Sequence, residues 1–281
     1  MYKGIFNFHV PGIHFEHAVD FHPPKDKFKA HTHDMIEINY FISGKARFVV
    51  EGNIYKRKPG DLLILRPAET HMPLIESSDP YERITMHISP SYLAQISPYS
   101  DQLLIPFFER ELGTYNQYDS SQFRSKHWKD CLYSIAENAR MSFEEKAYVD
   151  SNFISFLNEL YLAYSKRDLK SEQIKTDDLS INIIQYINNH LFDSISVGSM
   201  SEHFHISTAH MNRLFRKATG TSIWKYVLTK RLLAARVKIQ SGVSPQTVCF
   251  ECGFNDYSTF FRAYKSHFSL SPKDDYKNEG Q

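Results

Sequence analysis

The residues whose chemistry is easiest to interpret are the lysines and arginines in the last third of the chain. Between Glu202 and Glu251 the sequence contains no acidic residue. The same span contains eight basic residues: Arg213, Arg216, Lys217, Lys225, Lys230, Arg231, Arg236 and Lys238. A cationic surface without interleaved carboxylates suits a phosphate backbone, because counterion release supplies much of the affinity for nucleic acid. The alternative interpretation is an ordinary solvated face of basic helices.

The helices that must position such residues are predicted by caps and turns. Ser244 is a natural N-cap before Pro245, and Gly253 can take the positive φ that ends a helix and redirects the chain. Asp256 then caps a second helix with a polar, basic outward face that contains Tyr257, Ser258, Thr259, Arg262 and Lys265. Two short helices joined at a glycine predict a helix-turn-helix, although an ordinary helical hairpin has the same pattern.

A second copy of this plan lies upstream, in residues 195–219. It begins with a short helix around Val197–Phe204, turns at His205, and starts its second helix after the N-cap Ser207. That helix directs six residues outward: Ala209, His210, Asn212, Arg213, Arg216 and Lys217. A duplicated motif that coincides with the acid-free span favours nucleic-acid binding over a solvated basic face.

The two motifs and their spacer resemble the tandem helix-turn-helix domain of AraC/XylS-type transcription regulators. The resemblance rests on SxxHMNRLFRKATGTS, YVLTKRLLAARVKI and GFNDYSTFFRAYKSHFSLSP, and it covers roughly the last third of the chain. The sequence departs from the family pattern at Ser201, Cys249, Phe261 and Ser269, which are small or apolar enough to keep the fold. The resemblance implies regulation of transcription, most simply activation, with double-stranded DNA and RNA polymerase as partners.

Carried over position by position, the resemblance also implies roles for the outward residues. Base edges would be contacted by Ala209, Asn212 and Arg213 in the first motif and by Tyr257, Ser258 and Arg262 in the second. Arginine can bind guanine through two hydrogen bonds, and asparagine can read adenine. Phosphates would be held by Arg216, Lys217 and Lys265. A helix over Ser222–Gln240, about 28 Å long, would place the two recognition helices about one turn of DNA apart.

The three cysteines, Cys131, Cys249 and Cys252, do not form a disulfide framework. The spacing of Cys249 and Cys252 could suggest zinc or redox chemistry. However, no second ligand pair stands nearby, and both lie on the packing face of a predicted helix. We interpret them as buried apolar residues.

The N-terminal part contains short predicted strands separated by glycine-containing turns. These strands cover 37–42, 46–50, 53–57, 61–65 and 81–88. Frequent short strands of this kind predict a small β-barrel or jelly roll, which we assign to residues 1–119. The expected fold class is therefore α+β, with a barrel, a helical appendage and an all-α DNA-binding domain.

Several polar residues in this region resemble the two motifs of the cupin fold, a barrel whose mouth holds a metal or a small ligand. The resemblance implies that the metal-ligand positions of metallocupins correspond to His31, His33, Glu37 and His71. The second motif departs from the pattern, because Arg66 and Ala68 replace the usual proline and glycine.

Three interpretations of these four residues remain open. Imidazoles and a carboxylate could bind a divalent metal, could hydrogen-bond a polar effector, or could be structural groups satisfied by neighbours. Sensor cupins of AraC-type regulators commonly keep this pattern without metal, so the resemblance favours an effector site and no cofactor. The rings of Tyr40, Phe48 and Tyr55 could line a pocket suited to a sugar or a similar polar metabolite.

From residue 120 to residue 165 the apolar residues recur at helical spacing. One stripe contains Trp128, Leu132, Ile135 and Ala139, and the other contains Ile154, Leu157, Leu160, Tyr161 and Tyr164. The stripes could complete the barrel core or face a second subunit. AraC-type regulators often dimerise through such helices, so we expect a homodimer. The polar segment 166–178 is the predicted linker, and 179–281 the DNA-binding domain.

Composition limits the remaining classes. The chain has 281 residues, 42% of them hydrophobic, and a formal net charge of +1, as expected for a soluble globular protein of about two domains. No stretch predicts a membrane span or a signal peptide, so the expected location is the cytoplasm. The alternative function is a metal-dependent cupin enzyme or a metal-sensing regulator. The duplicated basic motif counts against the enzyme.

Overall fold

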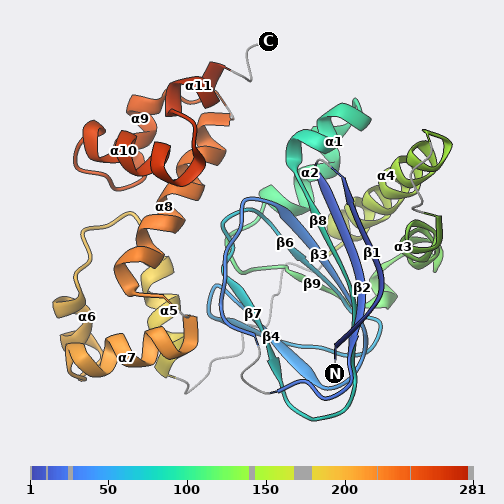
Figure 1. Ribbon diagram of the computed structural model, residues 1–281, viewed down its shortest axis with the longest axis horizontal. Helices are drawn as coiled ribbons and strands as arrows, with labels where there is room; N and C mark the ends of the chain where they lie inside the picture. The colour runs from blue at the N-terminus through green and yellow to red at the C-terminus, as the bar shows by residue number, and fades with distance from the viewer. Residues whose placement is uncertain are drawn as a thin grey trace. The chain divides into compact units, whose positions relative to one another are not determined.

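The computed structural model describes residues 2–10, 12–24, 28–138, 143–167, 179–219, 221–240 and 242–277. The chain divides into two compact units, which are described separately. The first contains Met1–Phe28 and Asp34–Lys175, and the second contains Lys29–His33 and Thr176–Gln281. The α+β class is confirmed, with a β-rich part before a helical part (Figure 1).

Strands of the first unit form two antiparallel sheets. In the described residues one sheet has the order β1-β2-β8-β3-β6-β9, and the other has the order β5-β4-β7. The strands are β1 (Tyr2–Val10), β2 (Ile13–Asp20), β3 (Ile36–Ser43), β4 (Ala46–Val50), β5 (Asn53–Lys56), β6 (Leu62–Leu65), β7 (His71–Ile75), β8 (Tyr81–Ile88) and β9 (Gln117–Tyr118). The strands predicted over 46–50 and 81–88 have these same bounds.

The two faces of the larger sheet have different neighbours. Ile36, Ile38 and Tyr40 of β3 are buried in the core that the helices cover. Successive residues of a strand point to opposite faces, so Glu37 points away from that core. It contacts His71 of β7, which shows that this second face is turned toward the smaller sheet.

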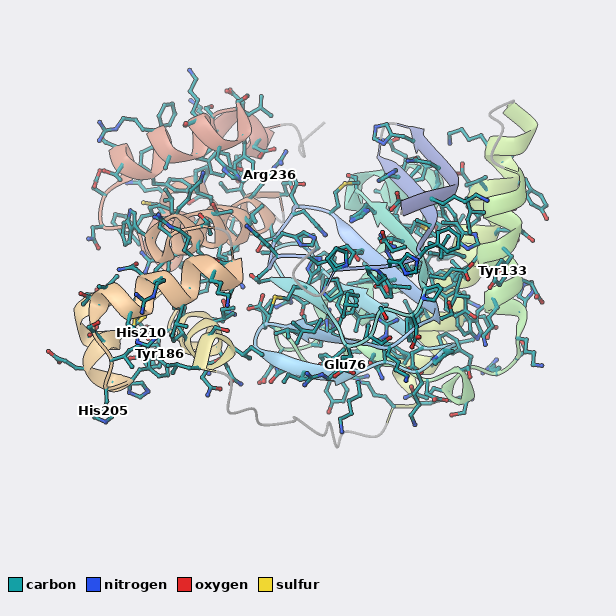
Figure 2. The ribbon with its side chains drawn as sticks, turned by 60° about the horizontal axis from the view of Figure 1, so that its bottom comes forward. Glu76, Tyr133, Tyr186, His205, His210 and Arg236 are labelled. Carbon is teal, nitrogen blue, oxygen red and sulfur yellow. The ribbon has the colours of Figure 1, made fainter. Side chains whose placement is uncertain are left out.

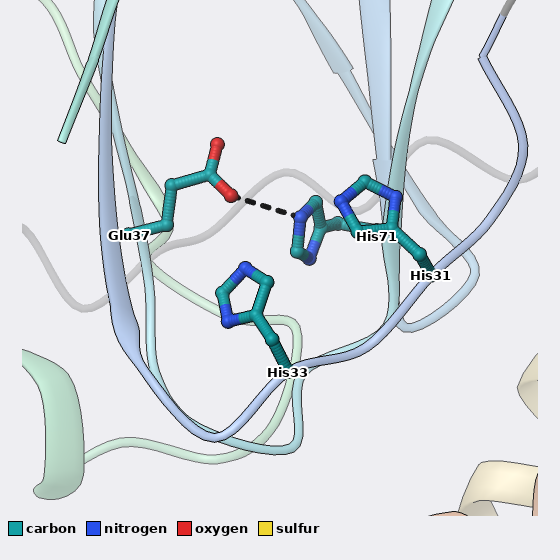
Figure 3. A group of neighbouring side chains, drawn as sticks. All are labelled: His31, His33, Glu37 and His71. Carbon is teal, nitrogen blue, oxygen red and sulfur yellow. Dashed lines mark ion pairs between the residues drawn. The ribbon is translucent and has the colours of Figure 1, made fainter. Parts of the chain in front are cut away.

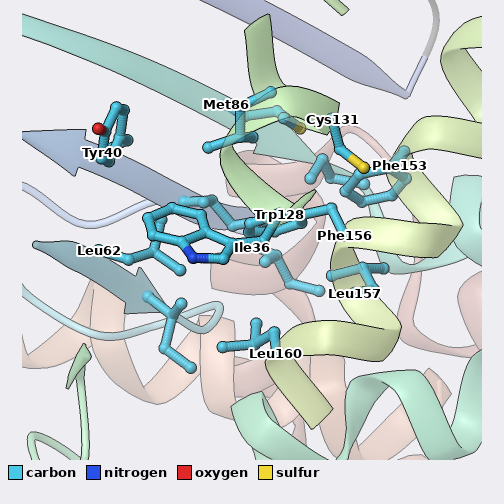
Figure 4. Close-up of a cluster of buried hydrophobic side chains, with 14 of the residues drawn as sticks. Ile36, Tyr40, Leu62, Met86, Trp128, Cys131, Phe153, Phe156, Leu157 and Leu160 are labelled. Carbon is cyan, nitrogen blue, oxygen red and sulfur yellow. The ribbon is translucent and has the colours of Figure 1, made fainter. Parts of the chain in front are cut away.

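Helices of the first unit close the other face of the larger sheet. They are α1 (Pro90–Ile96), α2 (Ser100–Phe108), the 3-10 turn η1 (Ser120–Gln122), α3 (His127–Asn138) and α4 (Phe143–Ser165). Trp128, Leu132, Leu157 and Leu160 are almost fully buried in one core with β3 (Figure 4). The residues of both predicted stripes therefore pack largely within this chain; Ala139 lies outside the described residues. Helices α1 and α2 were not predicted, although Ser89 before Pro90 is a start signal.

From residue 179 on, the described secondary structure of the second unit is helical. Its helices are α5 (Leu179–Asn189), α6 (Val197–His203), α7 (Thr208–Thr219), α8 (Ile223–Gln240), α9 (Pro245–Glu251), α10 (Tyr257–Phe268) and α11 (Pro272–Lys277). Helix α8 takes part in two cores. Ile223 and Val227 pack with residues of α5, α6 and α7, whereas Leu232 and Ile239 pack with residues of α9 and α10. Each motif thus has its own core, and α8 joins the two.

Buried Arg231 fastens the two halves of this unit. Its Nε donates to the Leu191 carbonyl (2.8 Å), and its Nη2 donates to the Asp193 carbonyl (2.8 Å), both beyond the end of α5. Its Nη1 donates to the Gly253 carbonyl (2.6 Å), in the turn after α9. Gly253 has φ of +76°, and a Cβ there would lie 2.7 Å from the Phe192 carbonyl oxygen. The close approach therefore requires glycine.

Candidate functional site

The first helix-turn-helix consists of α6 and α7. His205, in the turn between them, takes φ of +53°, and His210 follows in the first turn of α7 (Figure 2). The Ser207 hydroxyl accepts a hydrogen bond from the His210 amide (3.2 Å). Met211 and Phe215 of α7 are fully buried. The helix therefore keeps one face in the core and leaves the other exposed.

The second helix-turn-helix consists of α9 and α10. The Ser244 hydroxyl accepts from the Thr247 amide (3.3 Å), and the Asp256 carboxylate accepts from the Thr259 amide (2.7 Å). This backbone hydrogen bond to the charged form lowers the pKa of Asp256. The predicted N-caps of both helices are confirmed, and α10 presents a face that opposes its buried Phe260 and Tyr264.

Most residues predicted to contact DNA are exposed on these two helices. The exposed ones are Ala209, Asn212, Arg213, Arg216, Lys217, Ser258, Arg262 and Lys265, while His210 and Tyr257 are half-buried. The Asn212 amide donates to the Thr208 carbonyl (2.9 Å), and the Arg262 Nε donates to the Ser258 carbonyl (3.4 Å). Both side chains lie along their own helices.

The acid-free span does not form one continuous cationic surface. Lys230 and Arg231 are 1% and 8% exposed, so they belong to the interior. Arg236 pairs with Asp275 (3.1 Å) and Lys238 with Glu251 (2.5 Å). The prediction is wrong for these four residues, because two of them are buried and acids from outside the span neutralise the other two. The exposed basic residues of the span are Arg213, Arg216, Lys217 and Lys225.

A second cluster contains His31, His33, Glu37 and His71. One nitrogen or oxygen atom from each residue lies within 4.8 Å of those of the other three (Figure 3). Glu37 comes from β3 and His71 begins β7, while both other histidines stand on the segment that precedes β3. Glu37 and His71 are buried, and His31 is exposed. The four residues that the cupin resemblance singled out therefore lie together.

Hydrogen bonds define the tautomer of His71. Its Nδ1 lies 2.9 Å from the Glu69 carbonyl oxygen, which can only accept, so Nδ1 carries a proton. Its Nε2 faces the Glu37 carboxylate at 3.0 Å. Burial alone would lower the pKa of His71, but the Glu37 carboxylate outweighs this effect and the net pKa is raised. The pair can thus exist as imidazolium and carboxylate.

His87 is a further member of this cluster that we did not predict. It lies directly opposite Glu37 in the pairing of β8 with β3, and its Nε2 is 3.3 Å from a Glu37 carboxylate oxygen. His14 of β2 pairs with His87 and stacks on it, with ring centroids 5.8 Å apart. His87 could have been predicted only from the register of β2, β8 and β3, and a sequence pattern alone does not give that register.

The three predicted ring platforms have different positions. Tyr40 lies on the opposite face from Glu37, edge-on to Trp128 at 5.4 Å, so its predicted place in the pocket is wrong. The two residues are three positions apart, and a strand alternates its faces. Phe48 lies on the inner face of β4, where Val50 pairs with His71. The Tyr55 hydroxyl donates to the Gly113 carbonyl (2.5 Å).

Comparison with known proteins agrees with this two-part architecture. Residues 17–132 match the family described as an AraC-like ligand binding domain, and residues 200–278 match the family described as a helix-turn-helix domain. The chain belongs to the AraC family of transcription regulators. It combines a ligand-binding part with a DNA-binding part. None of the helices described for this AraC-family regulator has the length and apolar character needed to cross a membrane.

Several relatives extend along most of this AraC-family chain. An uncharacterized HTH-type transcriptional regulator of Bacillus subtilis, YbfI, is 24% identical over 88% of this chain and 86% of its own length. The HTH-type transcriptional activator RhaS of Yersinia pestis is 24% identical over 92% of each chain. The crystal structure of ToxT from Vibrio cholerae is 11% identical and covers 94% of this chain and 97% of its own, with a TM-score of 0.39.

Proposed function

We propose that this protein is a non-enzymatic, sequence-specific transcription regulator that responds to a small polar effector such as a sugar. The observation that supports it best is the pair of capped helices, α7 and α10, each with exposed basic residues and each supported by α8. Relatives named transcriptional activators favour activation, which would require contact with RNA polymerase. Such a protein would act in the cytoplasm.

The proposed binding mode uses both recognition helices on one face of DNA. In α7, Ala209, Asn212 and Arg213 would contact base edges, with His210 beside them. In α10, Tyr257, Ser258 and Arg262 would do the same. Phosphates would be held by Arg216, Lys217 and Lys265. Arginine side chains that bind guanine through two hydrogen bonds would contribute most of the discrimination.

The test uses DNA selected from a random pool by the full-length protein. We expect Arg213→Ala and Arg262→Ala each to weaken binding to the selected sequence by about 1–3 kcal/mol, the value of a good two-bond base contact. Binding to unselected DNA should change much less. The control is Lys273→Ala on α11, which removes an exposed positive charge outside both motifs. Equal losses on selected and unselected DNA would show that the two arginines hold phosphates.

We propose that His31, His33, Glu37 and His71 recognise the effector, with Phe48, on the same face of β4 as Val50, as a ring platform. The supporting observation is that exposed His31 and half-buried His33 lie within 4.8 Å of the buried Glu37–His71 pair, so a polar molecule would meet imidazoles and a carboxylate in one place. A panel of neutral monosaccharides, screened by thermal shift, provides the probes. Glu37→Gln should remove the shift while leaving DNA binding by the free protein nearly intact. A shift that survives in Glu37→Gln would place recognition elsewhere.

We also propose that the protein is a homodimer, as the family resemblance implies. Because the apolar stripes of α3 and α4 are largely buried within the chain, the interface would use other side chains of these helices. Tyr148 of α4 is 44% exposed, so its side chain could contact a second subunit. Sedimentation of Tyr148→Glu at several protein concentrations would test whether Tyr148 lies in the dimer interface. A dimer as stable as that of the wild type would exclude Tyr148 from the interface.

A second candidate function is a metal-sensing regulator, favoured by the four-residue cluster itself. Three imidazoles and one carboxylate are a suitable donor set for zinc, iron, nickel or manganese. The hydrogen bond from His71 Nδ1 to the Glu69 carbonyl would orient its Nε2 as a ligand, so the residues fit a metal. A bound cation would hold the mouth residues together. About one tightly held metal per purified chain, with DNA binding lost on chelation, would support this candidate over the sugar sensor.

A further inference from the structure

The loop that carries His71 is fastened by a buried ion pair between Glu69 and Arg110. The two guanidinium nitrogens lie 2.6 Å and 2.7 Å from the two carboxylate oxygens, and neither side chain has exposed surface. Burial alone would raise the pKa of Glu69, but Arg110 reverses the effect and lowers it, so the carboxyl is ionised. Such a two-bond pair has little freedom to reorient.

The same carboxylate accepts three further hydrogen bonds. They come from the Gly113 amide (2.8 Å), the Arg66 amide (2.9 Å) and the Asn116 side chain (3.0 Å). The Glu69 carbonyl accepts from His71 Nδ1 at 2.9 Å. One residue thus fixes both the loop before β7 and the ring that faces Glu37.

The other partner, Arg110, is bonded to α2 and is adjacent in sequence to a residue that contacts α4. Its Nε donates to the Pro106 carbonyl (3.0 Å) in α2, and its Nη1 also donates to the Thr114 carbonyl (2.9 Å). The preceding residue, Glu109, offers its carbonyl to the hydroxyl of Tyr164 in the last turn of α4. The ion pair and the end of α4 are therefore joined through adjacent backbone positions.

The contacts continue to the last described residue before the second unit. The Arg167 guanidinium lies over the Tyr164 ring, 3.3 Å from its centroid, and its Nη1 donates to the Tyr164 carbonyl (2.7 Å). Helix α4 ends at Ser165. A series of polar contacts thus runs from His71 through Glu69 to Arg110, and continues from the neighbouring Glu109 carbonyl through Tyr164 to Arg167.

We infer that Glu69 and Arg110 are positioning residues that couple the Glu37–His71 pair to the C-terminal end of α4. If a bound molecule rearranged His71, the end of α4, after which the chain continues toward the DNA-binding helices, would change its packing. The inference rests on the proposed function, since it assigns the effector site an output. Close-packed interiors transmit such displacements, and coupling between two sites is reciprocal. A change at Tyr164 must then be detectable at His71.

The test measures amide hydrogen exchange in the full chain, without any ligand. Tyr164→Phe removes the hydroxyl bonded to Glu109 but keeps the ring. We expect exchange in the segment 66–75 to accelerate about two- to thirtyfold, the range for residues within a coupling network. The matched control is Tyr92→Phe, which removes another hydroxyl bonded to α4, at Asp150 (2.5 Å). Exchange in 66–75 should not change in this control.

Arg167→Ala provides a second variant, at the half-buried end of the same network. It should accelerate exchange in 66–75 in the same direction as Tyr164→Phe. Unchanged exchange there in both variants, or an equal acceleration in Tyr92→Phe, would overturn the inference. The exchange result does not depend on an effector. If no monosaccharide binds, the sensor proposal fails while the coupling can still be demonstrated.

Discussion

At the scale of single residues, exposure and pairing decide what a basic side chain can do. Lys217 of α7 is exposed, whereas Lys238 of α8, in the same acid-free span, pairs with Glu251 at 2.5 Å. In the sequence the two lysines have the same character, since both lie in the span without acidic residues. Only the fold, which brings Glu251 of α9 next to α8, separates them.

This difference gives a prediction for salt dependence. Lys217→Ala should weaken binding to all DNA sequences alike and should reduce the slope of log K against log salt by about 0.9, the value for one phosphate contact. Lys238→Ala should change the slope less, because Glu251 already neutralises this lysine. The check is a series of DNA affinities measured from about 50 to about 200 mM salt, where the slope can be determined. Equal slopes in the two variants would contradict the assignment of Lys217 to phosphate.

The N-cap Asp256 gives a pH prediction. Its folded-state pKa is lowered by the hydrogen bond from the Thr259 amide, so its stabilising contribution is present above the ordinary aspartate pKa and is lost as pH falls through the lowered value. Asp256→Asn keeps an acceptor at the cap and removes the titration. We expect the melting temperature of the variant to fall less steeply with acidification than that of the wild type. Parallel curves would show that this cap does not contribute.

At the scale of elements, Arg231 determines how the two motifs are held within the second unit. Arg231→Lys retains the charge but cannot reach three carbonyls in different segments. We expect a loss of stability of about 1–3 kcal/mol for each carbonyl left without a donor. Urea unfolding of the full chain, followed by the helical circular dichroism signal, measures it.

Arg236→Lys is the matched control for this substitution. It lies on the same helix, and a lysine can keep an ion pair with Asp275, which Arg236 contacts at 3.1 Å. Its effect should therefore be small, within about 1 kcal/mol for a partly exposed pair. If both variants lose the same stability, the contacts of Arg231 with Leu191, Asp193 and Gly253 are not what holds the halves together.

The elements also show what a sequence can and cannot predict. Caps and turns are local, so Ser207, Ser244, Gly253 and Asp256 located both motifs correctly. Sheet faces depend on register between strands that are distant in sequence. The inward direction of Tyr40 was therefore mispredicted, and the place of His87 beside Glu37 was missed.

Buried ionic contacts were equally inaccessible from the sequence. Glu69 and Arg110 are separated by the whole of β7, β8, α1 and α2, and no local pattern marks them as partners. Residue type alone would place Lys230 and Arg231 on the surface, whereas the packing of α8 into two cores buries them. The cluster of His31, His33, Glu37 and His71 could be predicted, because the family resemblance already implied that these residues lie together.

At the scale of the whole molecule, the helical segment 176–281 can be tested apart from the sensor, although the second unit also includes Lys29–His33, which carries His31 and His33. The second unit contains both motifs and the two cores that support them. Those cores are built from residues of 183–268, so they need no side chain from the sheets. A fragment of residues 176–281 should therefore fold alone and keep both recognition helices.

We expect this fragment to be monomeric and to bind the selected DNA more weakly than the full chain. If the first unit dimerises the protein, the second DNA-binding unit acts at high effective concentration, and avidity can exceed single-site affinity by about 10²–10⁴-fold. Fluorescence anisotropy with DNA carrying one or two copies of the selected site measures this difference. The full chain should gain from the second copy and the fragment should not. A fragment that binds as tightly as the full chain on the two-copy DNA would mean that residues 1–175 do not join two DNA-binding units.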